Sequence, residues 1–131
     1  MAGSIEETIA AQERAIRLSP RDPKIWSYYF WTGQAHLLQS RVDEAIPWLG
    51  RASSANPEHP LPHAYLASAH ALKGSGERAA AALELARKLC ADDRYSSIAR
   101  LKTIGPFGAP KISALFEATY LMGLRKAGLT D

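Results

Sequence analysis

The stretch YFWTGQAHLLQSRVDEAIPWLGRASSANPEHPLPHAYLASAHALKGSGERAAAALELA, residues 29–86, decides the fold because it repeats itself. When it is shifted by 34 residues, small and apolar residues fall on residues of the same type. A period of this length is typical of repeat proteins, in which each copy forms one supersecondary unit. The identical pairs are Ala35 with Ala69, His36 with His70, Leu38 with Leu72, Ala45 with Ala79 and Ala52 with Ala86.

The repeat resembles the tetratricopeptide repeat (TPR), in which small residues recur at fixed points between large ones. Gly33 and Ala67 would face Ala45 and Ala79, so that two antiparallel helices approach closely. The resemblance implies an all-α solenoid of antiparallel helix-turn-helix hairpins, with about two repeats plus flanking helices. The first copy matches the family pattern at Tyr29, Thr32-Gly33, His36, Ala45, Leu49, Ala52 and Pro57, and the second at His63, Leu66-Ala67, His70, Ala79, Leu83 and Ala86. The second copy departs from the pattern at its end, where Ala91 replaces the proline.

The chain of 131 residues is expected to form a single TPR-like domain over residues 1–131. Its expected parts are a lone starting helix at 5–18, repeat 1 at 23–57, repeat 2 at 60–91 and C-terminal capping helices at 94–127. The starting helix looks like the second helix of a repeat that lacks its first helix, which suggests a fragment of a longer solenoid or a variant with an unpaired helix. The C-terminal segment is expected to cover the open end of the stack.

Composition points to a reducing compartment without a membrane anchor. The single Cys90 cannot form an internal disulfide, and no apolar run approaches the roughly 18 residues that a spanning helix needs. The first residues carry no secretory signal pattern, so a cytoplasmic location is expected. The net charge of +3 is uneven, because residues 1–66 carry six Lys/Arg against seven Asp/Glu and residues 67–131 carry ten against six. A basic half can attract nucleic acid or anionic partners, but a solvated helix surface is the favoured explanation.

No constellation of residues points to catalysis, and neither a metal nor a cofactor is predicted. His36 and His70 recur at one repeat position, which indicates a packing role. His59 and His63 have the spacing of a metal-binding helix, but prolines lie between them and the intervening glutamate of a zinc-protease motif is missing. Cys90 lies near basic residues but has no evident base to activate it.

The remaining candidate for function is a surface for protein binding. Five aromatic residues occur from Trp26 to Trp31, too many for one helix face, so one or two of them could contact a partner. The favoured alternative is that all five are core. By family resemblance the first helix of each hairpin lines a groove that could hold a peptide or a helix. The groove candidates are Trp31, Gln34, Leu38, Tyr65, Ser68 and Leu72. Because none of them is basic, a clamp on a terminal carboxylate is not expected. The alternative is that the starting helix or the C-terminal helix already fills the groove.

A closer resemblance covers nearly the whole chain. The run AIRLSPRDP at 15–23, the two repeats, Arg100-Leu101, Pro106-Phe107 and the ending GLRKAGL at 123–129 are similar to the C-terminal TPR segment of bacterial, often rhizobial, class III adenylate/guanylate cyclases and winged-helix regulators. No cyclase or winged-helix residues are present in the chain. The resemblance implies a non-catalytic scaffold or regulatory segment of a bacterial signalling protein.

Two alternatives to binding a different protein or peptide remain. The unpaired starting helix would expose an apolar face that a second copy could cover, giving a homodimer. The basic half could bind nucleic acid weakly through Arg87, Lys88, Arg94, Arg100 and Lys102. Only one aromatic residue, Tyr95, lies among these five cations, so this alternative is less favoured.

Overall fold

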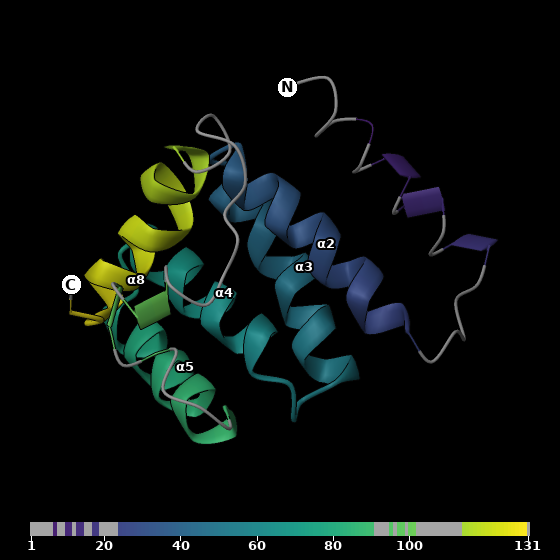
Figure 1. Ribbon diagram of the computed structural model, residues 1–131. Helices are drawn as coiled ribbons and strands as arrows, with labels where there is room; N and C mark the ends of the chain where they lie inside the picture. The colour runs from purple at the N-terminus through teal and green to yellow at the C-terminus, as the bar shows by residue number, and fades with distance from the viewer. Residues whose placement is uncertain are drawn as a thin grey trace.

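The computed structural model describes residues 7, 10, 11, 13, 14, 17, 18, 24–90, 95, 97, 98, 100, 101 and 114–130. Residues 24–90 form four α-helices in two antiparallel hairpins (Figure 1). The first hairpin contains α2 (Ile25–Leu38) and α3 (Val42–Ala55), and the second contains α4 (Pro60–Leu72) and α5 (Gly76–Leu89). The expected all-α fold of helical hairpins is therefore confirmed.

The turns of the two hairpins are built alike. Ser40 and Gly74, which the 34-residue shift aligns, both have positive φ, of 62° and 89°. In each turn the next amide donates to the carbonyl of the aligned histidine, from Arg41 to His36 at 2.9 Å and from Ser75 to His70 at 2.8 Å. The sequence repeat is thus also a repeat of backbone geometry.

Small residues allow the helices of each hairpin to approach closely. A Cβ atom placed on Gly33 would lie 2.7 Å from the Leu49 side chain and 3.2 Å from the Leu49 amide nitrogen. Ala45, Ala67 and Ala79 are completely buried, as the close-contact interpretation of the repeat requires. The small residues of the repeat pattern therefore lie at the helix contacts, and large ones such as Leu49 and Leu83 fill the space beside them.

Prolines lie near the starts of two helices. α4 begins at Pro60, because His59 acts as its N-cap and its Nδ1 atom accepts a hydrogen bond from the Leu61 amide at 3.2 Å. A proline at the first helical position costs no hydrogen bond. α3 begins at Val42, so Pro47 lies inside the helix, beyond its first turn. The helix tolerates Pro47 because the residue is exposed at the surface.

The last helix, residues 114–127, combines a π-helical turn, η2 (Glu117–Leu121), with α8 (Met122–Ala127). It ends at Gly128, whose φ of 116° is left-handed. We call residues 114–127 the C-terminal helix. It packs chiefly against α4, with a smaller contact to α5, and its π-helical turn reaches α2. The helix thus lies across the first helices of the hairpins, in addition to contacting the end of the stack (Figure 1).

One core joins the hairpins to the C-terminal segment. Phe30 and Leu37 from α2, Leu49 from α3 and Leu83 from α5 belong to the same cluster as the buried C-terminal side chains. The residues contributed from beyond α5 are Tyr95, Ile98, Leu101, Tyr120, Leu121, Leu124 and Leu129. The chain end is tied back by a hydrogen bond from the Ile98 amide to the Thr130 carbonyl at 2.7 Å.

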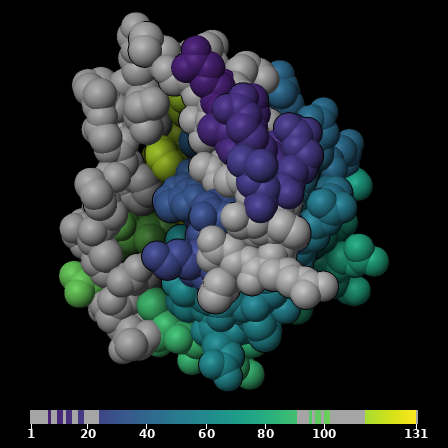
Figure 2. All heavy atoms as spheres, turned by 90° about the vertical axis from the view of Figure 1, so that its right-hand side faces the viewer, coloured from purple at the N-terminus to yellow at the C-terminus, as the bar shows by residue number. Residues whose placement is uncertain are grey.

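The described positions of the N-terminal segment lie on the opposite side of the hairpins from the C-terminal helix (Figure 2). Most of the expected starting helix at 5–18 and part of the expected C-terminal capping segment at 94–127 fall outside the described residues. Within the described part of the chain, the structure contains no helix long and apolar enough to cross a membrane.

Candidate protein-binding face

The candidate face consists of two stripes, one on each first helix. On α2 the residues Trp31, Gln34 and Leu38 are spaced to lie on one side of the helix. Trp31 is 44% exposed, whereas Gln34 and Leu38 are half-buried. Among the aromatic residues of α2, Phe30 is buried in the core and the others except Trp31 are half-buried. The aromatic run therefore serves mainly the core and leaves one large apolar side chain at the surface.

The stripe on α4 is largely covered by the chain itself. Tyr65 is 4% exposed and Ser68 is completely buried, while Leu72 is half-buried. The covering element is the C-terminal helix, since Ser68 Oγ donates to the Tyr120 carbonyl at 2.8 Å. A partner could therefore reach Tyr65 and Ser68 only after this helix had left α4. The six candidate residues divide into an accessible stripe on α2 and a covered one on α4.

A hydrogen bond connects the two stripes. Gln34 Nε2 donates to the Tyr65 hydroxyl oxygen at 2.9 Å. Burial raises the pKa of the Tyr65 phenol above its usual range, and the hydrogen bond from Gln34 partly offsets this effect. Tyr65 therefore stays neutral throughout the physiological range. Phe30 holds the same ring from the side, in an edge-to-face contact with centroids 4.9 Å apart.

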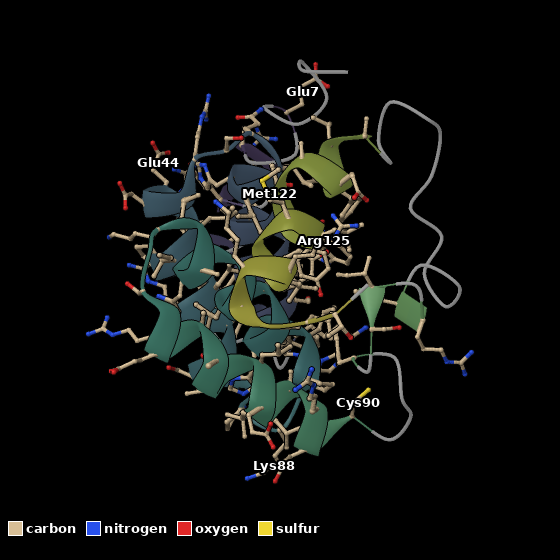
Figure 3. All side chains as sticks on the ribbon, turned by 90° about the vertical axis from the view of Figure 1, so that its left-hand side faces the viewer. Glu7, Glu44, Lys88, Cys90, Met122 and Arg125 are labelled. Atoms are coloured by element: carbon tan, nitrogen blue, oxygen red, sulfur yellow. The ribbon has the colours of Figure 1, made fainter. Side chains whose placement is uncertain are left out.

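Aromatic stacking fixes the C-terminal helix on α4. The rings of Tyr65 and Tyr120 are stacked, with centroids 3.9 Å apart and an interplanar angle of 10°. Phe116, one turn earlier, meets Tyr120 edge-on at 6.4 Å. Figure 3 shows the side of the molecule on which the C-terminal helix lies. Met122 and Arg125 are labelled on this helix, and Lys88 and Cys90 are labelled at the C-terminal end of α5.

The four histidines of the chain lie in the two repeats or in the loop between them. His36 is buried, with Nδ1 3.3 Å from a Glu44 carboxylate oxygen, and His70 is half-buried, as their shared repeat position predicts. His59 caps α4 and also packs on the ring of Trp26 at 4.6 Å. His63 Nε2 lies 2.9 Å from the Pro57 carbonyl oxygen. Among the described residues there is no group of three or more histidine, cysteine or acidic side chains that could hold a metal.

Two residues central to this face were missed by the sequence reasoning. Tyr120 and Gly123 lie in the expected C-terminal capping segment, 94–127, but neither was among the candidate residues. Tyr120 is one turn from both Phe116 and Leu124, so an extended stripe would have included it. An isolated glycine within a helical pattern often marks close packing, and Gly123 is an example. A Cβ atom there would lie only 2.1 Å from Ser68 Oγ and 2.5 Å from the Ser68 carbonyl oxygen.

Comparison with known proteins supports the repeat assignment. A family model described as a tetratricopeptide repeat matches residues 2–60, which include the first hairpin. No curated protein matches the chain. The second hairpin follows the first at a spacing of 34 residues and has the same turn geometry. TPR units are typically non-catalytic and generally mediate contacts between proteins. The chain therefore contains a tetratricopeptide repeat and folds as an all-α, TPR-like helical repeat protein.

Proposed function

We propose that the chain is a non-catalytic protein-binding module that recognises a partner protein or peptide through the α2 stripe, Trp31, Gln34 and Leu38, together with Leu72 of α4. The observation that carries the proposal is the exposure of Trp31, which is 44% accessible, whereas the other aromatic residues of α2 are buried or half-buried. Tryptophan is among the residues that contribute most binding energy at protein interfaces. The buried Phe30 packs against Trp31 edge-to-face, with ring centroids 5.2 Å apart.

The resemblance to C-terminal TPR segments supports a place for this module in a bacterial signalling protein as a scaffold or regulatory segment. In such a setting the described hairpins would supply binding surface and an upstream domain would supply any enzymatic or DNA-binding activity. The α2 stripe and the half-buried Leu72 of α4 carry no charged side chain, since Trp31, Gln34, Leu38 and Leu72 are neutral. We therefore expect an apolar partner segment with a few hydrogen-bonding groups, and affinity that depends weakly on salt.

Selection from a displayed random-peptide library tests this proposal. Peptides selected on the wild-type chain are measured against Trp31→Ala and against Trp48→Ala. Trp48 is a matched control, because it is a tryptophan on α3 and does not belong to the α2 stripe. Its ring centroid lies 6.1 Å from that of Tyr29 and 4.9 Å from the Arg51 Cζ atom. We expect Trp31→Ala to weaken binding at least tenfold, which corresponds to about 1.4 kcal/mol, and Trp48→Ala to change it little.

Selection of no peptide, or equal binding to both variants, would contradict the assignment of the α2 stripe. Circular dichroism of both variants confirms that the hairpins remain folded.

A further inference from the structure

The start of α4 satisfies its backbone donors in an unusual way. The run HPLPH at 59–63 places prolines at the first and third helical positions, where an amide would have no partner within the helix. The remaining donor in the first turn is the Leu61 amide, which donates to His59 Nδ1 at 3.2 Å. The His59 amide itself donates to the Asn56 carbonyl oxygen at 3.2 Å. One side-chain hydrogen bond therefore completes this helix start.

The bond from Leu61 requires a neutral His59 ring. A backbone N–H group can only donate, so the ring nitrogen that faces it must carry a lone pair and no proton. His59 is therefore held as the neutral imidazole whose proton lies on Nε2. A histidine side chain in water takes up a further proton at about pH 6.5, close to the pH of cells. Mild acid thus acts on the atom that caps α4.

His63, one turn into the helix, has the opposite requirement. Its Nε2 atom lies 2.9 Å from the Pro57 carbonyl oxygen, which can only accept a hydrogen bond. Nε2 must therefore carry a proton, and it does so in the doubly protonated ring as well as in one neutral tautomer. Protonation breaks the bond at His59 and leaves the bond at His63 intact.

The charged groups near His59 act in both directions. The positive end of the α4 dipole disfavours a cation at the N-cap, and so does the exposed Lys24 at the start of α2. The Trp26 ring, whose centroid lies 4.6 Å from that of His59, favours a cation. So does Glu58, the only acidic residue in 56–72, but its carboxylate is exposed and screened by salt. None of these groups gives a protonated Nδ1 the lone pair that Leu61 needs.

His59 lies in the connection between the two hairpins. α3 ends at Ala55 and α4 begins at Pro60, so residues 56–59 join them. The His59 ring also packs on Trp26 of α2, which belongs to the first hairpin. A protonated ring that turns away from Leu61 changes this contact as well. The cap therefore affects the packing of one repeat on the other, in addition to the end of one helix.

We propose that the connection at 56–63 is an acid-sensitive joint between the two repeats. When His59 is neutral, it caps α4 and packs on Trp26, and the joint is closed. As the pH falls through the titration range of histidine, at about pH 6.5, the proton on Nδ1 breaks the cap. The Leu61 amide then has no acceptor at this position, and the first turn of α4 loosens. The joint is independent of the proposed binding face, because it uses no residue of the α2 stripe.

Amide hydrogen exchange in the full chain tests the joint. The protection of the Leu61 amide is measured by nuclear magnetic resonance at about pH 7.5 and pH 5, and corrected for the intrinsic pH dependence of exchange. We expect this protection to fall about threefold or more in the wild-type chain, which is within the usual effect of losing an N-cap. It is expected to change little in His59→Asn, because asparagine is a good N-cap that does not titrate. His63→Gln keeps a donor for the Pro57 carbonyl and is the matched control, expected to retain the wild-type fall.

Leu129 is the internal reference, because its amide donates to the Leu124 carbonyl at 2.9 Å near the chain end. An equal fall at Leu129 would show that acid unfolds the whole chain, which overturns a local joint. Unchanged protection of Leu61 in the wild-type chain also overturns the proposal. So does an equal fall in His59→Asn, or loss of the response in His63→Gln.

The nitrogen-15 shifts of the His59 ring give a second measurement that needs no variant. They distinguish the neutral tautomer with its proton on Nε2 from the one with its proton on Nδ1. At about pH 7.5 we expect the Nε2–H tautomer, because Nδ1 must accept from Leu61. If His59→Asn does not fold, this measurement decides. The Nδ1–H tautomer, or a ring that is already protonated at this pH, would overturn the proposal.

Discussion

Gly33 lies at a close contact between α2 and α3. Its missing side chain leaves room for Leu49, which is completely buried and has its Cδ2 and Cγ atoms 2.7 Å from the position that a Cβ would take. Leu49 cannot move freely, because the core surrounds it. The residue type at position 33 thus controls how closely the first hairpin packs.

We expect Gly33→Ala to lower the free energy of unfolding by about 1–3 kcal/mol, the usual cost of overpacking a core. Gly50→Ala is the control, and it is expected to raise this free energy by about 0.5–1 kcal/mol because alanine has the higher helix propensity. Urea unfolding followed by circular dichroism measures both. Equal effects of the two changes would contradict the close contact.

His70 makes stability depend on pH. Burial lowers its pKa below the ordinary value of 6.5, and the nearby Arg78 and Lys73 act in the same direction. Because the folded-state pKa is the lower one, the unfolded chain takes up the proton first as the pH falls. The stabilising contribution of neutral His70 is therefore complete well above pH 6.5, decreases as the pH falls through 6.5, and is gone below the folded-state pKa.

We expect the free energy of unfolding to decrease between about pH 7.5 and pH 5, and to decrease less in His70→Gln. Urea titrations at several pH values measure the difference between the two chains, which removes the contributions of the other titrating groups. Parallel curves for the two chains would show that His70 does not contribute.

At the scale of the elements, α3 contains a proline that opposes helix formation. Pro47 lies in the helix interior, where it cannot donate the hydrogen bond that an amide at this position would make to the Asp43 carbonyl. Pro60, by contrast, occupies the first position of α4, where no such bond is lost. Pro47 therefore costs α3 one backbone hydrogen bond, whereas Pro60 costs α4 none.

We expect Pro47→Ala to stabilise the protein by about 1–3 kcal/mol. The helical penalty of proline, about 3 kcal/mol, is partly offset by the greater entropy of the unfolded variant, about 0.4–1 kcal/mol. Pro60→Ala is expected to be neutral or slightly destabilising. Thermal and urea unfolding measure both variants. A loss of stability in Pro47→Ala would indicate that the proline supports a packing contact of α3.

At the scale of the whole molecule, one core extends from α2 to the C-terminal helix. All three tryptophans, Trp26, Trp31 and Trp48, lie in the first hairpin, so their fluorescence reports on that hairpin alone. Far-ultraviolet circular dichroism reports on all helices. Because Tyr120 and Leu124 share a buried cluster with Phe30, the hairpins and the C-terminal helix should unfold together.

We expect coincident urea transitions by fluorescence and circular dichroism in the wild-type chain. In Gly123→Ala the transitions are expected to separate, with part of the helical signal lost before the fluorescence changes. Two separate transitions in the wild-type chain would show instead that the C-terminal helix undocks independently of the hairpins.

The sequence by itself determined the hairpins. The 34-residue period requires like residues at like positions, and the buried Ala45, Ala67 and Ala79 are a direct consequence of it. The recurring histidines also lie at equivalent turns. These contacts are local, between helices adjacent in the chain, so a residue pattern is enough to predict them.

The tertiary structure alone decided what covers α4. An amphipathic stripe shows that a helix buries one side, but it does not identify the surface against which that side packs. Ser68 and Tyr120 are separated by 52 residues, and the aligned pattern treats Ser68 as the counterpart of the α2 stripe residue Gln34. Their bond depends on a π-helical turn and on the glycine contact at Gly123. The division of the face into an accessible and a covered stripe therefore follows from long-range packing, which the period of a repeat does not specify.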